Sequence, residues 1–360
     1  MIVEVNLGSR SYRIVVAAGA LQSVGERLRE LRLGTRAALV SDGAVMRLYG
    51  KTVVTSLEVA GFTVTTIDVP EGEAAKTLAV AQHCWDQLLT AGLDRTSTVL
   101  ALGGGAVGDV AGFAAATYMR GINFVQLPTT VLAQVDASVG GKTAIDHPLG
   151  KNMIGAFHQP RLVVVDPAVA RTLPEREFRS GLAEIVKHGI VLDAGYFAEL
   201  ERDLAPLAAR DLGVLERIIG GSCRLKASVI ERDEREAELR HVLNYGHTIG
   251  HALEASTGYA RYAHGEAVAL GMVAEARLAR RLGIADDETT TRQQRMLERL
   301  GLPVRAPSID VEPVVTAMAR DKKAKDGRIP FVLAPRIGEF RLVYDIPSAE
   351  IRAAIASLAS

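Results

Sequence analysis

The residues best suited to chemistry in this sequence are histidines and acids gathered in its second half. Five of the eight histidines lie between positions 188 and 264. Asn244, His247 and His251 are spaced i, i+3 and i+7, which places them on one face of a predicted helix. A histidine pair four residues apart on a helix is one way to build a zinc-type site. A lone histidine is usually a packed core residue, but this concentration near acids favours a metal site.

Two neighbouring segments supply further candidate ligands. Residues 181–188 place an acid and two bases on one face of another predicted helix, and residues 264–266 follow the histidine pair. Neutral imidazoles and carboxylates both bind zinc-type ions, so spacing alone does not choose among them. Two ligand sets are equally plausible on this reasoning: His188, His251 and Glu266, or Glu184, His247 and His264.

A predicted strand, a glycine turn and the start of a helix occupy residues 98–109. Gly103, Gly105 and Gly108 fit the pattern GxGxxG, in which glycines let backbone amides approach a phosphate at a helix N-terminus. The acid usually found about 20 residues downstream is missing. Asp42 instead follows an earlier predicted strand. The sequence therefore predicts a dinucleotide site with a different strand order from the common one.

Polar residues also follow other predicted strands at the point where each strand ends. Residues 71–76 follow the strand at 63–69 and combine carboxylates with Lys76, while Thr129 and Thr130 follow another strand. Ligands of α/β proteins bind at the carboxyl ends of strands, where carboxylates can hold ribose hydroxyls and a lysine can hold a phosphate. Taken alone, residues 71–76 look more like a solvated turn. These two strand ends and the glycine turn after the strand at 98–102 together favour a cofactor cleft.

Residues 134–152 form a polar, glycine-rich segment that carries Lys142 and Lys151. We expect a loop here that binds a phosphorylated substrate, although a surface turn fits the composition equally well. Lys226 and Arg240 add further cations later in the chain.

The first half of the chain alternates short apolar runs with helical patterns. Such alternation predicts an α/β domain with a largely parallel sheet. The predicted strands are residues 2–7, 12–16, 37–40, 63–69, 98–102, 123–127 and 162–165, and the predicted helices lie near 20–32, 44–60, 77–91 and 106–118.

The pattern becomes helical from Pro174 to about residue 320, with alanine, leucine, glutamate and arginine dominating. We expect two domains: residues 1–174 as a nucleotide-binding α/β domain, and residues 175–360 as a mainly helical metal- and substrate-binding domain. The predicted helices are 175–192, 196–203, 211–233, 242–257, 265–282 and 288–300, followed by a strand pair at 330–333 and 340–343 and a last helix from 347.

Bulk composition excludes several classes of protein. Lysine plus arginine equals aspartate plus glutamate, 42 each, so no global field draws the chain to nucleic acid or to a membrane. The most membrane-like stretch, residues 99–119, contains Asp109, a charge that a spanning helix would normally avoid. Cys84 and Cys223 lie far apart and form no CxxC pair. This sparse use fits reduced cytoplasm better than a disulfide framework.

Together these motifs resemble the 3-dehydroquinate synthase family. The histidine block and the segment at 150–160 are the most specific parts of the resemblance, which covers nearly the whole chain. The matching segments are residues 70–76, 103–109, 127–130, 150–160, 181–187, 244–251 and 264–266, with Asp42 and the run 321–323.

The resemblance implies the residues around each bound molecule. It implies Glu184, His247 and His264 as ligands of one divalent ion, zinc or cobalt. Around NAD it implies Asp42, Glu71, Gly72, Glu73, Ala74, Ala75, Lys76, Gly105, Ala106, Val107, Gly108, Asp109, Thr129, Thr130, Lys142, Lys151, Val169, Ala170, Arg171 and Thr172. Around the substrate it implies Arg120, Asp136, Lys142, Asn152, Lys187, Lys226, Arg240, Asn244, His251 and Lys322.

Three positions depart from the family pattern without removing a proposed ligand. Ala106 stands where valine is common, and Tyr245 stands where leucine or phenylalanine is common. Asp146 stands where asparagine is common and adds a negative charge to the polar segment. We therefore expect the local geometry to differ most around Asp146.

The reaction implied by the resemblance converts 3-deoxy-D-arabino-heptulosonate 7-phosphate, a phosphorylated sugar acid, to 3-dehydroquinate and phosphate. It proceeds by transient oxidation with NAD, phosphate elimination, re-reduction and aldol cyclisation. Such a carbon–oxygen lyase serves the shikimate pathway of aromatic amino acid biosynthesis. Two alternatives remain: a related cyclase acting on sedoheptulose 7-phosphate, and a metal-dependent polyol dehydrogenase. Lys226, Arg240 and His251 favour the carboxylate-bearing substrate, and the phosphate-binding residues argue against the dehydrogenase.

Arg120 suggests a homodimer. It follows the helix that begins at the glycine turn, and a helix of about 13 residues is roughly 20 Å long. An arginine at the far end could not easily reach its own substrate, yet the resemblance gives it a role at the substrate phosphate. Both statements hold if Arg120 enters the neighbouring subunit's site across a two-fold axis. Alternatively, Arg120 only caps the carbonyls at its own helix end.

Overall fold

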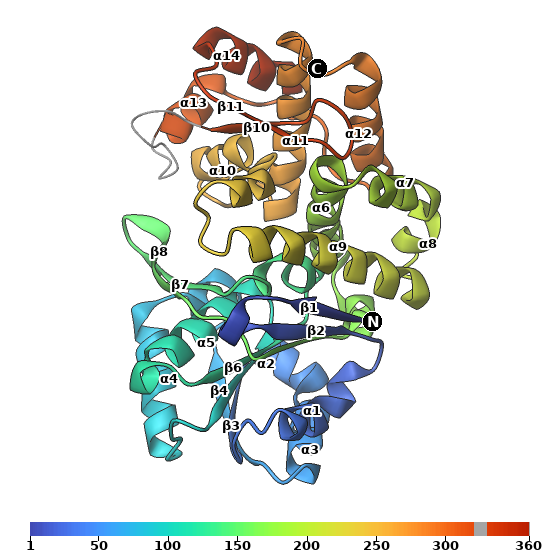
Figure 1. Ribbon diagram of the computed structural model, residues 1–360. Helices are drawn as coiled ribbons and strands as arrows, with labels where there is room; N and C mark the ends of the chain where they lie inside the picture. The colour runs from blue at the N-terminus through green and yellow to red at the C-terminus, as the bar shows by residue number, and fades with distance from the viewer. Residues whose placement is uncertain (320–329, 360) are drawn as a thin grey trace. The chain divides into compact units, whose positions relative to one another are not determined.

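The computed structural model describes residues 1–319 and 330–359 (Figure 1). The chain folds into two compact units. The first unit contains Met1–Leu173 together with Leu215–Glu231, and the second begins at Pro174 and takes the remainder. Within the described residues, no helix has both the length and the apolar character needed to cross a membrane.

A seven-stranded sheet forms the centre of the first unit, in the order β1-β2-β9-β6-β5-β3-β4. Only β1 runs antiparallel to its neighbour, which confirms the predicted α/β class with a largely parallel sheet. The strands are β1 Ile2–Val5, β2 Tyr12–Val16, β3 Arg36–Asp42, β4 Thr63–Val69, β5 Thr98–Gly103, β6 Asn123–Pro128 and β9 Leu162–Val165.

The register of the parallel strands brings their carboxyl ends to one edge of the sheet. Asp42 pairs with Val69, and Gly103 pairs with Pro128. The strand order reverses between β3 and β5, because β4 lies on one side of β3 and β5 on the other. Open α/β sheets bind ligands outside such a switch point.

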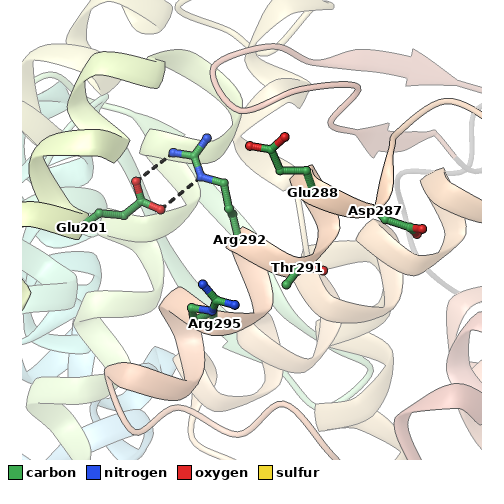
Figure 2. A pocket seen from close by; sticks show the side chains of 6 residues that line it. All are labelled: Glu201, Asp287, Glu288, Thr291, Arg292 and Arg295. Atoms are coloured by element: carbon green, nitrogen blue, oxygen red, sulfur yellow. Dashed lines mark hydrogen bonds and ion pairs between the residues drawn. The ribbon is translucent and has the colours of Figure 1, made fainter.

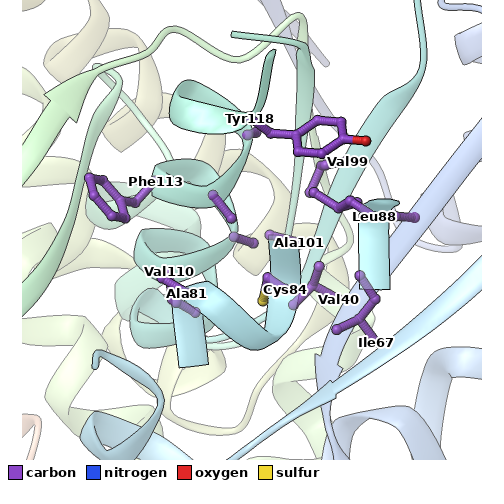
Figure 3. Close-up of a cluster of buried hydrophobic side chains, with 14 of the residues drawn as sticks. Val40, Ile67, Ala81, Cys84, Leu88, Val99, Ala101, Val110, Phe113 and Tyr118 are labelled. Atoms are coloured by element: carbon purple, nitrogen blue, oxygen red, sulfur yellow. The ribbon is translucent and has the colours of Figure 1, made fainter. Parts of the chain in front are cut away.

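Helices cover both faces of this sheet. Since successive strand residues point to opposite faces, Val40 packs with α4 and α5, while Leu39 packs with α1 and α3. Figure 3 shows the α4–α5 side, where Cys84 of α4 lies in the same buried cluster as Val40 of β3 and Ala101 of β5. The helices are α1 Val24–Glu30, α2 Gly43–Val45, α3 Lys51–Val59, α4 Leu78–Thr90 and α5 Gly105–Thr117.

Helix α5 lies unusually close to its neighbours because glycines line its inner face. A Cβ atom on Gly112 would lie 2.4 Å from Thr143 Cγ2 and 3.0 Å from the Phe124 ring. A Cβ atom on Gly108 would lie 2.9 Å from Gln126 Oε1. These close approaches hold the N-terminus of α5 at the carboxyl edge of the sheet.

The polar segment expected to be a loop forms a hairpin instead. β7 Lys142–His147 pairs antiparallel with β8 Gly150–Phe157, with a register shift between Ile145 and His147. The prediction failed because β8 is largely exposed and lacks the alternation of polar and apolar residues that marks a half-buried strand.

Helix α9, Leu212–Arg232, contributes most of its length to the first unit. The Cys223 thiol donates to the backbone oxygen of Gln134 at 3.3 Å. The Asn6 backbone N–H donates to Glu231 Oε1 at 2.7 Å. Residues 215–231 were expected in the helical half, and these contacts explain why they pack with the sheet.

The second unit is mainly helical, as expected, with one small antiparallel strand pair. Its centre is α11, whose residues are buried along most of their length against α6, α10 and α12. Its elements are α6 Glu175–Leu192, α7 Ala194–Arg202, α8 Leu204–Ala208, α10 His247–Ser256, α11 His264–Arg281, α12 Asp287–Arg299, α13 Val311–Ala319, β10 Phe331–Leu333, β11 Arg341–Val343 and α14 Ser348–Ala356.

The helix predicted over residues 242–257 is wrong at its start. Residues Leu239–Asn244 form a 3-10 turn, and α10 begins only at His247. Gly246 has φ 77°, a left-handed conformation that a continuous α-helix cannot contain. Asn244 therefore does not share a helix face with His247 and His251.

Candidate metal centre and cofactor edge

Three histidines and one glutamate of the second unit meet beside α10 and α11. One ring nitrogen from each of His247, His251 and His264 lies within 4.8 Å of the others. Glu184 reaches the same place from α6: its Oε1 atom lies 3.4 Å from His247 Nε2 and 3.7 Å from His264 Nε2. The helices thus bring together the residues that the family resemblance named, together with His251.

The distances around Glu184 fit a shared metal ion better than hydrogen bonds. Two atoms bound to one tetrahedral zinc ion, each about 2.0–2.2 Å from it, lie about 3.4 Å apart. The separations of 3.4 and 3.7 Å from Glu184 to His247 and His264 are close to that value and longer than good hydrogen bonds. One carboxylate oxygen and two imidazole nitrogens suit a zinc-type ion and leave positions for substrate oxygens.

One backbone contact orients the His247 imidazole, and another anchors the backbone next to His264. His247 Nδ1 lies 3.1 Å from the backbone oxygen of Tyr245, which keeps the proton on Nδ1 and leaves Nε2 to face Glu184. The Gly265 N–H donates to Ser180 Oγ at 2.9 Å, which ties the start of α11 to α6. These contacts hold His247 and His264 before any ion arrives.

Burial and charge give the cluster unusual pKa values. Burial lowers the pKa of His264, but Glu184 and Glu254 outweigh this effect and raise it to about 10. Burial and the nearby Lys187 ammonium hold the pKa of His247 well below its ordinary value. Burial raises the pKa of Glu184, but Lys187 and His247 outweigh it and hold it well below the usual range. A metal must therefore displace a proton from His264, and its affinity should fall as the pH falls.

The alternative ligand set of His188, His251 and Glu266 is less well supported by geometry. Glu266 is held by Arg176, with Oε2 2.6 Å from Arg176 Nη2, and it also accepts the Ala263 N–H at 2.8 Å.

Sequence reasoning missed Glu254, whose Oε2 atom lies 3.5 Å from His264 Nδ1. Its spacing was a usable signal, because Glu254 follows His247 and His251 at i+7 and i+3.

In the first unit, the residues predicted to bind NAD follow the carboxyl ends of five strands. Except for Lys142 and Lys151, which lie on the hairpin β7–β8, they lie after β3, β4, β5, β6 and β9, so the parallel topology places them along one edge. Gly104 caps α5 without a side chain, which leaves the first amides of that helix open to an anion. A Cβ atom on Gly104 would lie 3.3 Å from Thr130 Cγ2, and one on Gly105 would lie 3.2 Å from Ala137 Cβ.

A buried lysine links this edge to the hairpin. Lys76 Nζ lies 2.7 Å from Asp109 Oδ2 and also donates to Asn152 Oδ1. Asp146, the departure noted in the sequence, accepts the Asn152 N–H at 2.7 Å, and its own N–H donates to the Lys76 oxygen at 2.8 Å. Lys151 pairs with Glu73 at 2.9 Å. Asp146 thus contacts both Asn152 of the hairpin and the backbone of Lys76.

Burial raises the pKa of Asp109 to about 6, although Lys76 opposes the shift. Burial lowers the pKa of Lys76, but Asp109 and Glu73 outweigh it and raise it. Asp42, at the end of β3, uses one carboxylate oxygen to accept the Val45 N–H at 2.9 Å. Its other oxygen could accept a hydrogen bond from a ribose hydroxyl.

The residues predicted around the substrate are divided between the two units. In the first, Lys226 donates to the Asp136 backbone oxygen at 2.6 Å and to its carboxylate, while Arg120 is exposed beyond α5. In the second, the buried Arg240 donates to the Glu234 oxygen at 2.6 Å. Asn244 Nδ2 lies 3.3 Å from Glu236 Oε1, and Lys187 pairs with Glu184. Lys322 lies outside the residues that the structure describes.

A separate hollow of about 560 Å³ lies between α7 and α12 (Figure 2). Its central arginine, Arg292, is already paired with Glu201 through two contacts of 3.2 and 2.8 Å. None of the predicted site residues in the described part of the chain lines this hollow, so it is not the candidate site.

Two family models cover most of the chain. Residues 66–180 match the model for the 3-dehydroquinate synthase N-terminal region, and residues 181–324 match the model for its C-terminal region. The chain belongs to the 3-dehydroquinate synthase family. A 3-dehydroquinate synthase of Geobacter metallireducens is 53% identical over 339 residues, which cover 94% of each chain. That of Nostoc punctiforme is 47% identical over 354 residues, which cover 98% of each chain.

Solved structures share the fold. A 2-epi-5-epi-valiolone synthase, ValA from Streptomyces hygroscopicus subsp. jinggangensis, has NAD+ and Zn2+ bound; its TM-score is 0.89 at 29% identity, over 98% of both chains. A 2-deoxy-scyllo-inosose synthase, complexed with carbaglucose-6-phosphate, NAD+ and Co2+, has a TM-score of 0.88 at 24% identity, over 99% of this chain and 100% of that one. A glycerol dehydrogenase of Schizosaccharomyces pombe has a TM-score of 0.71 at 18% identity, over 96% of this chain and 88% of that one. At this identity the likeness shows a shared fold and nothing more.

The raised pKa of Asp109 predicts an unusual dependence of stability on pH. Because its folded pKa of about 6 exceeds the ordinary 3.8, folding takes up a proton between these values. The free energy of unfolding of the wild type, minus that of Asp109→Asn, should fall as the pH rises from 4 to 6, by at most about 1.4 kcal/mol per unit. Urea unfolding followed by Trp85 fluorescence measures it. Asp86→Asn, an exposed acid on α4, is the control; a flat difference for Asp109→Asn contradicts the shift.

Proposed function

We propose that this protein is a 3-dehydroquinate synthase, which converts 3-deoxy-D-arabino-heptulosonate 7-phosphate to 3-dehydroquinate and phosphate. The observation that carries the proposal is identity of about 50% to 3-dehydroquinate synthases over nearly the full chain. The cluster of the buried Glu184 and His247 with the partly buried His264 supports it, because this chemistry needs a Lewis acid. Phenylalanine or leucine is common where Tyr245 stands, but this difference leaves the ligands intact.

The proposed metal ligands are Glu184, His247 and His264, with His251 beside them. NAD is proposed to lie along the carboxyl edge of the sheet, with phosphates at the start of α5 and a ribose at Asp42. When bound, NAD takes and returns a hydride and the metal polarises substrate hydroxyls. The protein's own task is to hold these groups: Glu184 keeps its charge beside His247 and beside His264, whose proton the ion displaces, and the open amides of α5 bind anionic oxygen.

Two features support a phosphorylated sugar acid as substrate. The residues proposed around the substrate include cations suited to its phosphate, such as Lys142 on the hairpin, which a polyol dehydrogenase would not need. The family resemblance gives Arg240 and Lys226 the role of holding a carboxylate, which sedoheptulose 7-phosphate lacks, and each is nearly buried in its own unit, at 2% and 4% exposure. These residues favour 3-dehydroquinate synthase over both alternative activities.

We also propose a homodimer in the cytoplasm. Hairpin β7–β8 exposes apolar side chains, a feature typical of interaction surfaces. The hairpin's base adjoins the segment after Arg120: His158 Nε2 lies 2.8 Å from the Ile122 oxygen. Both cysteines are buried and unpaired with each other, as suits a reducing compartment. The exposed apolar residues are Leu149, Met153, Ile154 and Phe157, at 91%, 53%, 41% and 48% exposure.

The activity itself predicts that NAD is needed in catalytic amounts, because the hydride taken from the substrate is returned to it. At limiting NAD, each cofactor molecule should support many molecules of 3-dehydroquinate and phosphate. Phosphate release from 3-deoxy-D-arabino-heptulosonate 7-phosphate and from sedoheptulose 7-phosphate, with NADH absorbance followed in parallel, separates the three activities. A product-to-NAD ratio that never exceeds one would exclude the cyclase, and faster release from sedoheptulose 7-phosphate would reassign the substrate.

The metal proposal predicts that His247→Ala loses both the ion and the activity while remaining folded. Removing one of three ligands leaves an incomplete donor set, and the loss should exceed about 100-fold in affinity. Elemental analysis after dialysis and circular dichroism measure occupancy and folding. His83→Ala, an exposed histidine on α4, is the control. Full occupancy in His247→Ala would show that the ligand assignment is wrong.

The cross-subunit role of Arg120 predicts complementation. Arg120→Ala and Lys187→Ala should each be inactive. If Arg120 serves the neighbouring subunit, a heterodimer of the two variants keeps one site with both residues, and equal random mixing should restore about one quarter of wild-type activity. Subunit exchange is verified with tagged chains by native mass spectrometry. A mixture that exchanges subunits but stays as inactive as the separate variants would place Arg120 in its own subunit's site or outside the chemistry.

A further inference from the structure

A second fully buried carboxylate lies behind the metal centre, on α11. Glu275 has 0% exposure, and its Oε2 atom accepts the backbone N–H of Gly246 at 2.6 Å. Glutamates are almost never fully buried unless they are paired or hydrogen-bonded. Glu275 belongs neither to the predicted ligand set nor to the predicted substrate residues. Its contact, however, falls on the residue immediately before His247.

The turn at Gly246 is held by one face of α11. A Cβ atom on Gly246 would lie 2.6 Å from Met272 Cγ and 2.7 Å from the Val268 oxygen, and one on Gly271 would lie 1.9 Å from the Gly246 oxygen. Positions 268, 271, 272 and 275 follow the spacing of a single helix face. The carboxylate of Glu275 adds a hydrogen bond to this steric cradle, so the turn is fixed by both shape and charge.

The residue before the turn is tied down as well. Tyr245 is fully buried, and its hydroxyl donates to Gln293 Oε1 and lies 3.4 Å from the Met272 oxygen. A leucine or phenylalanine at this position could make neither contact. The polar network beneath the turn is therefore a feature of this chain, in which Tyr245 and Glu275 fix neighbouring residues.

These contacts act on the metal ligand through one peptide group, the one that joins Tyr245 to Gly246. His247 Nδ1 lies 3.1 Å from the Tyr245 oxygen, so the ring orientation depends on how the peptide at Tyr245 and Gly246 is rotated. The Glu275 bond to the Gly246 N–H fixes that same peptide. Rotation of this peptide would turn His247 Nε2 away from Glu184 Oε1, which lies 3.4 Å from it.

We propose that Glu275 is a positioning residue for the metal site, which holds the Tyr245–Gly246 peptide so that His247 presents Nε2 to the ion. The inference rests on the proposed metal centre. Residues that orient metal ligands through hydrogen bonds typically change metal affinity by about 10–100-fold when they are replaced. Glu275 acts through His247 and touches neither the ion nor the substrate.

The test measures zinc affinity by chelator competition and the visible absorption of the cobalt-loaded protein. Glu275→Leu should weaken zinc binding by about 10–100-fold and change the cobalt spectrum, because His247 is no longer held. Glu275→Gln should recover most of the affinity, since its amide oxygen can still accept the Gly246 N–H. Arg277→Met is the matched control: Arg277 donates from the same helix to Gln294 Oε1 at 3.1 Å, away from the turn. The Arg277→Met variant should have a lower free energy of unfolding, with unchanged zinc affinity and an unchanged cobalt spectrum.

The outcomes separate this inference from the metal proposal. Equal zinc affinity in wild type and His247→Ala means that the metal centre itself is misassigned. If His247→Ala loses zinc but Glu275→Leu keeps wild-type affinity and spectrum, the positioning role is overturned. If Glu275→Leu does not fold, Glu275→Ala decides: it removes the same acceptor of the Gly246 N–H without adding a branched side chain, and a weakening in the same direction is expected. Unchanged binding in Glu275→Ala would then overturn the proposal.

Discussion

A carboxylate without contact to water is the constraint on which the second unit depends. Glu184 is fully buried, and moving an uncompensated charge into a protein interior costs several kcal/mol. Its charge is retained because Lys187, His247 and His264 surround it. These partners come from α6, α10 and α11, so the packing of three helices serves one charge. Repacking that separated them would leave the carboxylate unpaired.

In the first unit, strand direction is the corresponding constraint. Parallel strands must end at the same edge, so loops that are far apart in sequence become neighbours there. The glycines of α5 let that helix approach β6 and β7, which keeps its open amides at this edge. The buried Lys76 ammonium then joins the partly buried Asp109 carboxylate at this edge to Asn152 of the hairpin. Both units place charged groups in apolar surroundings. The second does so by packing three helices around Glu184, and the first by gathering strand ends at one edge of a sheet.

Long, regular elements could be predicted from the sequence because their periodicity is local. The observed bounds of β2, β4, β9 and α6 are those expected from apolar runs and flanking turn residues. Features decided by distant residues could not be predicted. The conformation of Gly246 depends on packing against α11, so a continuous helix was expected where α10 begins late.

The candidate site shows the same division between local and distant signals. Spacing located the cluster of histidines but left two ligand sets open, and the family resemblance chose between them. Only the folded chain showed that Arg176 holds Glu266 and that Glu254 contacts His264. The hairpin β7–β8 was missed because its exposed strand carries no burial pattern.

The placement of α9 has a consequence for how the protein is made. The chain leaves the first unit after Leu173 and returns to it between Leu215 and Glu231. During synthesis, a nascent chain of 173 residues contains every strand of the large sheet but lacks the helix that covers Gln134 and binds Asn6. The first unit therefore finishes its packing only after Glu231 has left the ribosome. A gene fragment that ends at Leu173 would encode the whole sheet without α9, so Gln134 and Asn6 would lack their partners on that helix.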